Sequence, residues 1–157
     1  MKTSIGISDK NREAVVDILN TVLSDEYLLY TKTRNFHWNV TGPDFGELHK
    51  FFEAQYEALN DIVDDTAERA RSLGGRSLGT MTEFLKHAHL KEAPGVYPEA
   101  KKMISDLLVG HEMIIQKLRK DLAACADEYQ DMGTTDYLTG LMEKHEKMAW
   151  MLRAYLS

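Results

Sequence analysis

The sequence contains few of the residues that form disulfides, thiolate clusters and tight turns. It has one cysteine, Cys125, and three prolines in 157 residues. A single cysteine excludes an intrachain disulfide and a thiolate metal cluster within one chain, so we expect Cys125 to be a small buried residue in reducing surroundings. The scarcity of proline is compatible with long, uninterrupted helices.

Long hydrophobic runs are also absent. No stretch of about eighteen apolar residues occurs, and the N-terminal MKTSIGISDKN lacks the apolar region of a secretory signal. We therefore expect no membrane contact and a cytoplasmic location, with the nucleoid as a more specific alternative. The net charge of −6 repels polyanions on average and attracts cations wherever carboxylates gather.

What is present is helical in character. Runs rich in Leu, Ala, Glu, Lys and Met, without sustained alternation, predict an all-α chain. We expect a first helix from Ser8 or Asp9 to Gly42-Pro43 and a second from an Asp44/Glu47 capping pair to Gly74-Gly75. The third begins near Pro98 and the fourth follows residues 133–135.

A long connection separates these two helical hairpins. Between Gly74 and Tyr97 it holds one short helix, for which Thr80 and Glu83 form the capping pair. Two hairpins joined by one long crossover match the ferritin-like version of the four-helix bundle. We expect one domain over residues 1–157, with 1–8 as a short N-terminal tail.

The usual di-iron signature of such bundles is missing, because no glutamate has a histidine three residues later. This absence argues against a metal site inside one bundle and predicts an apolar core. Four histidines outside the motifs discussed below are expected to be surface or packing residues: His87, His89, His111 and His145.

Imidazoles and carboxylates instead gather along the first two helices. His37 ends the first, while the second carries His49 and Glu53 four residues apart and then Asp64 and Glu68 four apart. Residues four apart share a helix face, and this set of ligands suits iron, manganese or zinc. His49 and Asp64 are fifteen positions apart, or about 22 Å along the helix axis, so one chain cannot close both pairs on one ion.

A symmetric dimer removes this difficulty. Two copies of the second helix, packed antiparallel about a twofold axis, bring the His49 end of one beside the Asp64 and Glu68 end of the other. The spacing therefore predicts two equivalent sites per dimer, each shared between subunits. Two alternatives stay open: His37 as a residue that favours the helix dipole, and Asp64 with Glu68 as solvated surface acids.

One stretch resembles a known family: NFHWNVTGPDFGELHKFFEAQYEALNDIVDDTAERARSLGG, with His-Trp-Asn, Gly, Phe-x-x-x-His and Asp-x-x-x-Glu-Arg at the family spacing. It is similar to the signature of the Dps family, DNA-binding proteins from starved cells, and TTDYLTGLMEKHEKMAWMLRAYL resembles the family's last helix. The resemblance implies that His37 and His49 of one subunit bind iron with Asp64 and Glu68 of its twofold mate. Glu53 lies where family members often place a carboxylate for a second iron.

The resemblance also implies an activity and an assembly. The expected protein is a ferroxidase that oxidises Fe²⁺, with hydrogen peroxide favoured over oxygen. Ferric mineral is then stored inside a hollow homododecamer built from twofold dimers, which protects against oxidative damage. Trp38 resembles the family's tryptophan beside the iron centre, with an interface or core aromatic as the alternative. Asp127, Asp131 and Asp136 resemble the carboxylates of the threefold entry pores, with Glu146 deeper inside; each alone could equally be a solvated acid.

DNA binding in this family is attributed to a lysine-rich tail, whereas this N-terminus carries only Lys2, Lys10 and Arg12. We therefore expect DNA binding to be weak. Two rival functions remain: a DNA-compacting structural shell protein with little ferroxidase activity, and a zinc or manganese buffer.

Overall fold

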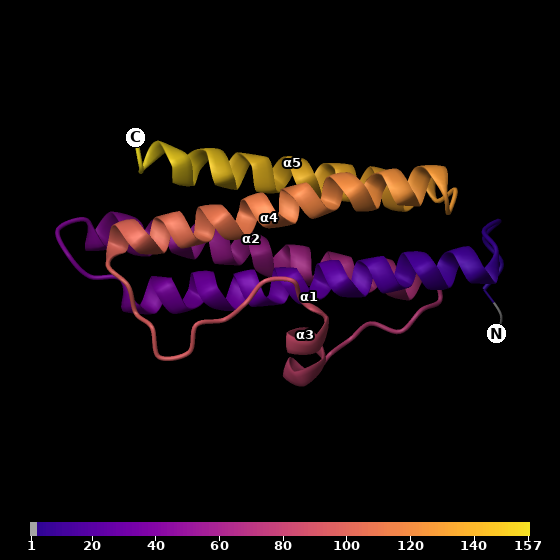
Figure 1. The fold of residues 1–157 in the computed structure, drawn as a ribbon, viewed down its shortest axis with the longest axis horizontal. Coiled ribbons are helices and arrows are strands. Elements are labelled where there is room, and N and C mark those ends of the chain that lie inside the picture. The colour runs from indigo at the N-terminus through magenta and orange to yellow at the C-terminus, as the bar shows by residue number, and fades with distance from the viewer. Residues whose placement is uncertain (1–2) are drawn as a thin grey trace.

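The computed structural model describes residues 3–157, and among them it contains five helices and no strand. The helices are α1 (Asp9–Asn39), α2 (Phe45–Ser72), α3 (Met81–His87), α4 (Ala100–Asp127) and α5 (Met132–Ala154). Figure 1 shows α1 with α2 as one antiparallel hairpin and α4 with α5 as the other, while the crossover with the short α3 runs beside α1. The predicted all-α bundle with one crossover is confirmed.

The described part of the N-terminal segment is short and precedes the first helix. Residues 3–8 precede α1 without helical structure, and residues 1–2 of the predicted tail, including Lys2, lie outside the described residues. Ser8 caps α1, since its hydroxyl accepts a hydrogen bond from the Asn11 amide at 3.2 Å. No helix in residues 3–157 is long and apolar enough to cross a membrane.

The turn between α1 and α2 differs from the prediction at both ends. α1 ends at Asn39, three residues before Gly42, because Gly42 has a φ of +111° and the residue before a proline avoids the helical region. Asp44 is the N-cap residue of α2, as predicted, but the capping pair with Glu47 is wrong. Asp44 has φ −95° and ψ 15° and its side chain makes no cap hydrogen bond. Glu47 instead accepts a bond from the Tyr155 hydroxyl at 2.8 Å.

The predicted cap of α3 is confirmed, whereas the predicted start of α5 is corrected. Thr80 and Glu83 form a reciprocal capping box at α3, as expected: the Glu83 amide donates to the Thr80 hydroxyl and the Thr80 amide to the Glu83 carboxylate. α5, however, begins at Met132 rather than after residues 133–135. Asp131 is its N-cap and accepts from the Thr134 amide at 3.0 Å, so these residues form the first helical turn.

A single core of buried side chains runs through all five helices. Its largest fully enclosed members include Leu19, Phe52, Leu107 and Leu138, one from each long helix. The prediction of an apolar core is nevertheless wrong in part: Glu26, His111 and His145 are 0% exposed. These three residues come from three different helices, so no local sequence motif predicts that they are buried together.

Candidate metal centre

His37 and His49 face each other where α1 ends and α2 begins. His37 Nδ1 lies 2.7 Å from the His49 carbonyl oxygen, and His49 Nδ1 lies 2.9 Å from the His37 carbonyl oxygen. A carbonyl oxygen only accepts hydrogen bonds, so each Nδ1 must donate. In the neutral ring this leaves each Nε2 with a free lone pair, which is the form in which histidine binds a metal.

Neighbouring rings hold this pair in place. The two imidazoles stack with centroids 3.8 Å apart and planes 20° apart. Phe45 stacks on His49 at 5.2 Å, and the edge of Tyr56 meets His37 at 5.2 Å. The imidazoles are therefore oriented before any ion arrives, which lowers the entropy cost of binding one.

Tyr56, which contacts His37, is itself held by neighbouring side chains. Its hydroxyl donates to Glu53 Oε1 over 3.5 Å, and burial together with the Glu53 carboxylate raises the pKa of Tyr56. The Arg34 guanidinium lies 5.2 Å from the Tyr56 ring and 5.3 Å from the Trp38 ring. Trp38 is 64% exposed, which excludes the core alternative for this residue within one chain.

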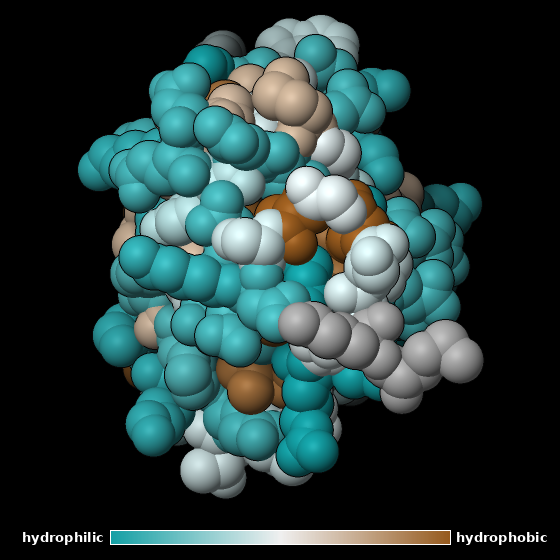
Figure 2. All heavy atoms as spheres, turned by 90° about the vertical axis from the view of Figure 1, so that its right-hand side faces the viewer, coloured by the Kyte–Doolittle hydropathy of each residue, from teal (hydrophilic) through white to brown (hydrophobic). Residues whose placement is uncertain are grey.

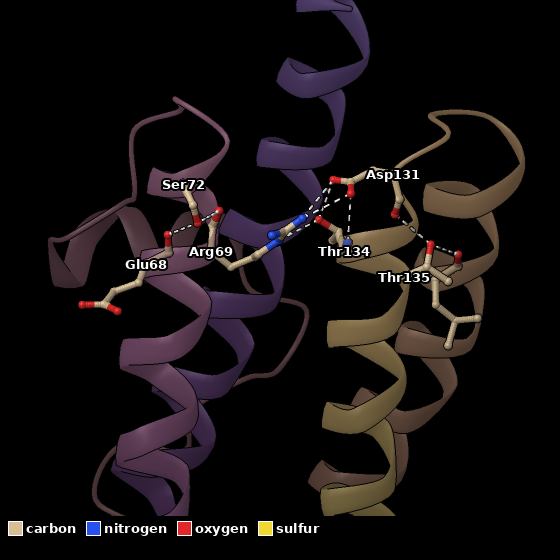
Figure 3. A network of polar contacts seen from close by, with 7 residues as sticks. Glu68, Arg69, Ser72, Asp131, Thr134 and Thr135 are labelled. Atoms are coloured by element: carbon tan, nitrogen blue, oxygen red, sulfur yellow. Dashed lines mark hydrogen bonds and ion pairs between the residues drawn. The ribbon is translucent and has the colours of Figure 1, made fainter. Parts of the chain in front are cut away.

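Asp64 and Glu68 lie apart from the histidines, toward the other end of α2. Both are exposed. Figure 3 shows the Glu68 carboxylate pointing away from the polar network of Arg69 and Asp131. In residues 3–157, no group of three or more His, Cys, Asp or Glu is placed to hold a metal ion within one chain. The structure thus joins His37 with His49 and leaves the two acids separate.

The predicted pore acids have unequal surroundings. Asp131 is only 3% exposed, and its carboxylate accepts hydrogen bonds from the Thr134 amide at 3.0 Å, the Thr134 hydroxyl at 2.6 Å and Arg69 at 3.2 Å (Figure 3). These contacts give Asp131 a structural role in the single chain. Glu146 pairs with Arg119.

Asp127 and Asp136 are exposed near the α4–α5 turn. That end of the bundle is mostly hydrophilic, with a few hydrophobic side chains near its middle (Figure 2). The pore role of all four acids remains a prediction.

Sequence reasoning missed the residues that support the histidines. Phe45 and Tyr56 lie four residues before and seven residues after His49, a spacing that places all three on one face of α2. This periodicity was a usable signal. Arg34, three residues before His37 on α1, carries the same kind of signal.

Comparison with known proteins agrees with this architecture. The family model described as a ferritin-like domain matches residues 16–157. The chain is 46% identical over 155 residues to an uncharacterized low temperature-induced protein of Nostoc, covering 99% of this chain and 87% of that protein. It is 38% identical over 144 residues to DNA protection during starvation protein 2 of Bacillus anthracis, covering 91% and 97%.

Solved structures of similar fold also indicate a ferritin-like architecture. A Dps protein of Vibrio cholerae, described as a member of a superfamily of ferritin-like diiron-carboxylate proteins, superposes with a TM-score of 0.90 at 27% identity, covering 99% of this chain and 100% of that one. Fold and sequence therefore define a ferritin-like protein. Within that class, the chain belongs to the Dps family of mini-ferritins.

Proposed function

We propose that this protein binds Fe²⁺ at sites shared between two subunits, oxidises it and stores the ferric product within a shell of identical subunits. Membership of the ferritin-like Dps family supports iron storage and DNA protection in general terms. The observation that carries the more specific proposal is the reciprocal bonding of His37 and His49, which leaves two Nε2 atoms free for a metal.

In this proposal each subunit supplies two halves of different sites. His37 and His49 hold the first iron through Nε2, and Asp64 with Glu68 of the twofold mate complete its coordination. Glu53, one helical turn beyond His49, is suited to a second iron. Carboxylates are hard ligands that stabilise Fe³⁺ more than Fe²⁺, so a site rich in them favours loss of the electron.

The proposed oxidant is hydrogen peroxide, with oxygen as the alternative. Two Fe²⁺, one H₂O₂ and two protons give two Fe³⁺ and two waters, so both electrons that the peroxide needs come from iron and no hydroxyl radical is released. Asp127, Asp136 and Glu146 would attract Fe²⁺ toward the shell. Trp38, exposed one residue after His37, would intercept radicals that escape.

The experiment that tests shared sites uses two complementary variants. One carries His37→Ala and His49→Ala; the other carries Asp64→Asn and Glu68→Gln. Each alone should lose peroxide-driven iron oxidation. When the two are refolded together in equal amounts, half of the dimers are mixed and each mixed dimer has one intact site, so activity should recover to about a quarter of the native value.

The matched control is Asp65→Asn, which removes an exposed acid next to Asp64 and should leave oxidation unchanged. Failure of the mixture to recover, while both variants form shells of native size, would show that the sites are not shared. Zinc added in competition distinguishes the metal-buffer alternative: in that case zinc binds without any iron oxidation by the native protein.

A further inference from the structure

Three ionisable side chains meet in the middle of the bundle, away from the candidate iron site. Glu26 of α1, His111 of α4 and His145 of α5 are each 0% exposed. His145 Nε2 lies 2.8 Å from Glu26 Oε1, and His145 Nδ1 lies 2.9 Å from His111 Nδ1. We call these three residues the buried triad.

The bonding pattern limits how many protons the triad can hold. An ionised Glu26 only accepts, so His145 donates from Nε2. The contact between the two Nδ1 atoms then needs one proton, carried by either ring. If both imidazoles become charged, two N–H groups face each other across this contact and the hydrogen bond is lost.

The triad is arranged for protons rather than for a metal ion. His145 uses both ring nitrogens, which lie on different edges of the imidazole, so the donors follow one another in a line. Across the described part of the chain, no three such residues are placed to hold an ion. Two triad atoms, Glu26 Oε2 and His111 Nε2, are buried without a hydrogen-bond partner.

Among the described residues, the buried acids outside the triad already bond to other groups. The buried residues of α2 include the polar Gln55 and Thr66 but no ionisable group, and the buried residue of α3 is Phe84. On α1, Asp25 is occupied by the His89 and Leu90 amides.

On α4, Asp121 pairs with Lys117. On α5, Tyr137 donates to Thr66, whose own hydroxyl donates to the Ile62 carbonyl. A proton added to His111 therefore places a positive charge in the interior while the described buried acids outside the triad are bonded elsewhere.

We propose that the buried triad is a proton-sensitive connection between the two helical hairpins, which joins α1 to α5 and α4 and loses stability when His111 is protonated, because the added proton puts a positive charge into the interior. The connection crosses the interface between the hairpins, where α1 and α2 face α4 and α5 (Figure 1). This inference does not depend on the proposed iron chemistry.

The direction of the pH effect follows from linkage. Burial, reinforced by His145, lowers the pKa of His111 well below its ordinary value. Below the ordinary histidine pKa of about 6.5, the unfolded chain binds a proton at this position that the folded chain does not. Stability therefore falls with falling pH, and this single group raises the unfolding equilibrium constant by up to about tenfold per pH unit.

The test compares the native protein with His111→Asn from pH 7.5 to pH 5 by urea unfolding at one protein concentration. An asparagine amide can donate to His145 Nδ1 but cannot titrate. The variant should lose up to about a tenfold-per-unit dependence of the unfolding constant on pH. The control, His87→Asn at an exposed position on α3, should keep the native pH dependence. An unchanged dependence in His111→Asn overturns the proposal.

A second measurement needs no variant. In the native protein labelled with ¹⁵N-histidine, the ring nitrogens of His111 should stay in their neutral form as the pH is lowered through the ordinary histidine pKa of about 6.5. The change at His111 should coincide with loss of the native spectrum. Protonation of His111 near the ordinary histidine pKa in the intact fold would show that the triad is no such connection.

Discussion

Several polar side chains in this protein bond to backbone groups near helix ends. His37 and His49 exchange bonds with each other's carbonyl oxygens, and Asp131 accepts from the first turn of α5. The His37 carbonyl in the last turn of α1 and the Thr134 amide in the first turn of α5 are groups that have no partner inside their own helix. The residues expected to do chemistry therefore also stabilise the fold, and their substitutions affect both.

Cys125 gives a prediction at this scale. It is 0% exposed, and burial, with Asp131 and Asp121 adding to it, raises the pKa of its thiol to about 12. The thiolate is the reactive form. We expect no reaction with a chromogenic disulfide reagent at pH 8 in the native protein and one thiol per chain in denaturant. Rapid reaction of the folded protein would contradict this expectation.

At the scale of helices, the connection between α2 and α5 depends on a few polar contacts near the α4–α5 turn. Arg69 of α2 donates to the Thr134 hydroxyl at 3.0 Å and to Asp131 at 3.2 Å. Thr66 and Tyr137 add a hydroxyl contact of 2.6 Å between the same helices. Figure 3 shows how Asp131 serves both its own helix and the facing one.

Substitution of Asp131 separates these two roles. Asp131→Ala removes the helix cap, worth about 0.5–2 kcal/mol, and a bond to a charged group, worth about 1.5–3 kcal/mol. Asp131→Asn keeps a good capping side chain, but it loses the charge opposite Arg69 and one of the two acceptor oxygens, the one that bonds the Thr134 hydroxyl. Urea unfolding should therefore show a clearly smaller loss for Asp131→Asn. Equal losses would mean that the cap contributes nothing measurable.

At the scale of the whole molecule, the net charge and the separation of the candidate ligands determine which partners the protein can bind. The net charge is −6, and the histidine pair, which lies where α1 ends and α2 begins, is separated from the two acids further along α2. The first property disfavours polyanions, and the second means that the proposed iron site, which combines the histidines with the acids, requires a second copy of the chain. The same charge that repels DNA would help to concentrate Fe²⁺.

A gel-retardation experiment with duplex DNA tests the expectation that this protein binds DNA weakly. Binding that depends on phosphate contacts weakens steeply with salt, and this chain has few basic residues near its N-terminus. We expect little or no gel retardation of duplex DNA at about 0.15 M salt, conditions under which basic DNA-binding proteins still bind. A salt-dependent shift without iron oxidation would favour the DNA-compacting alternative.

The amino-acid sequence by itself determined the local features. The scarcity of proline and the run of helix-forming residues predicted the four long helices, and the Thr80/Glu83 spacing predicted the cap of α3, because each depends on residues close in the chain. Axial spacing along α2 was enough to show that His49 and Asp64 of one chain cannot share an ion.

Only the tertiary structure decided the rest. It oriented His37 and His49 through each other's carbonyl oxygens, committed the Asp131 carboxylate to Arg69, and enclosed Glu26, His111 and His145 in an interior expected to be apolar. These residues lie far apart in sequence, so no periodicity within one helix links them. Their chemistry depends on which helix faces meet, and that is a property of packing rather than of local sequence.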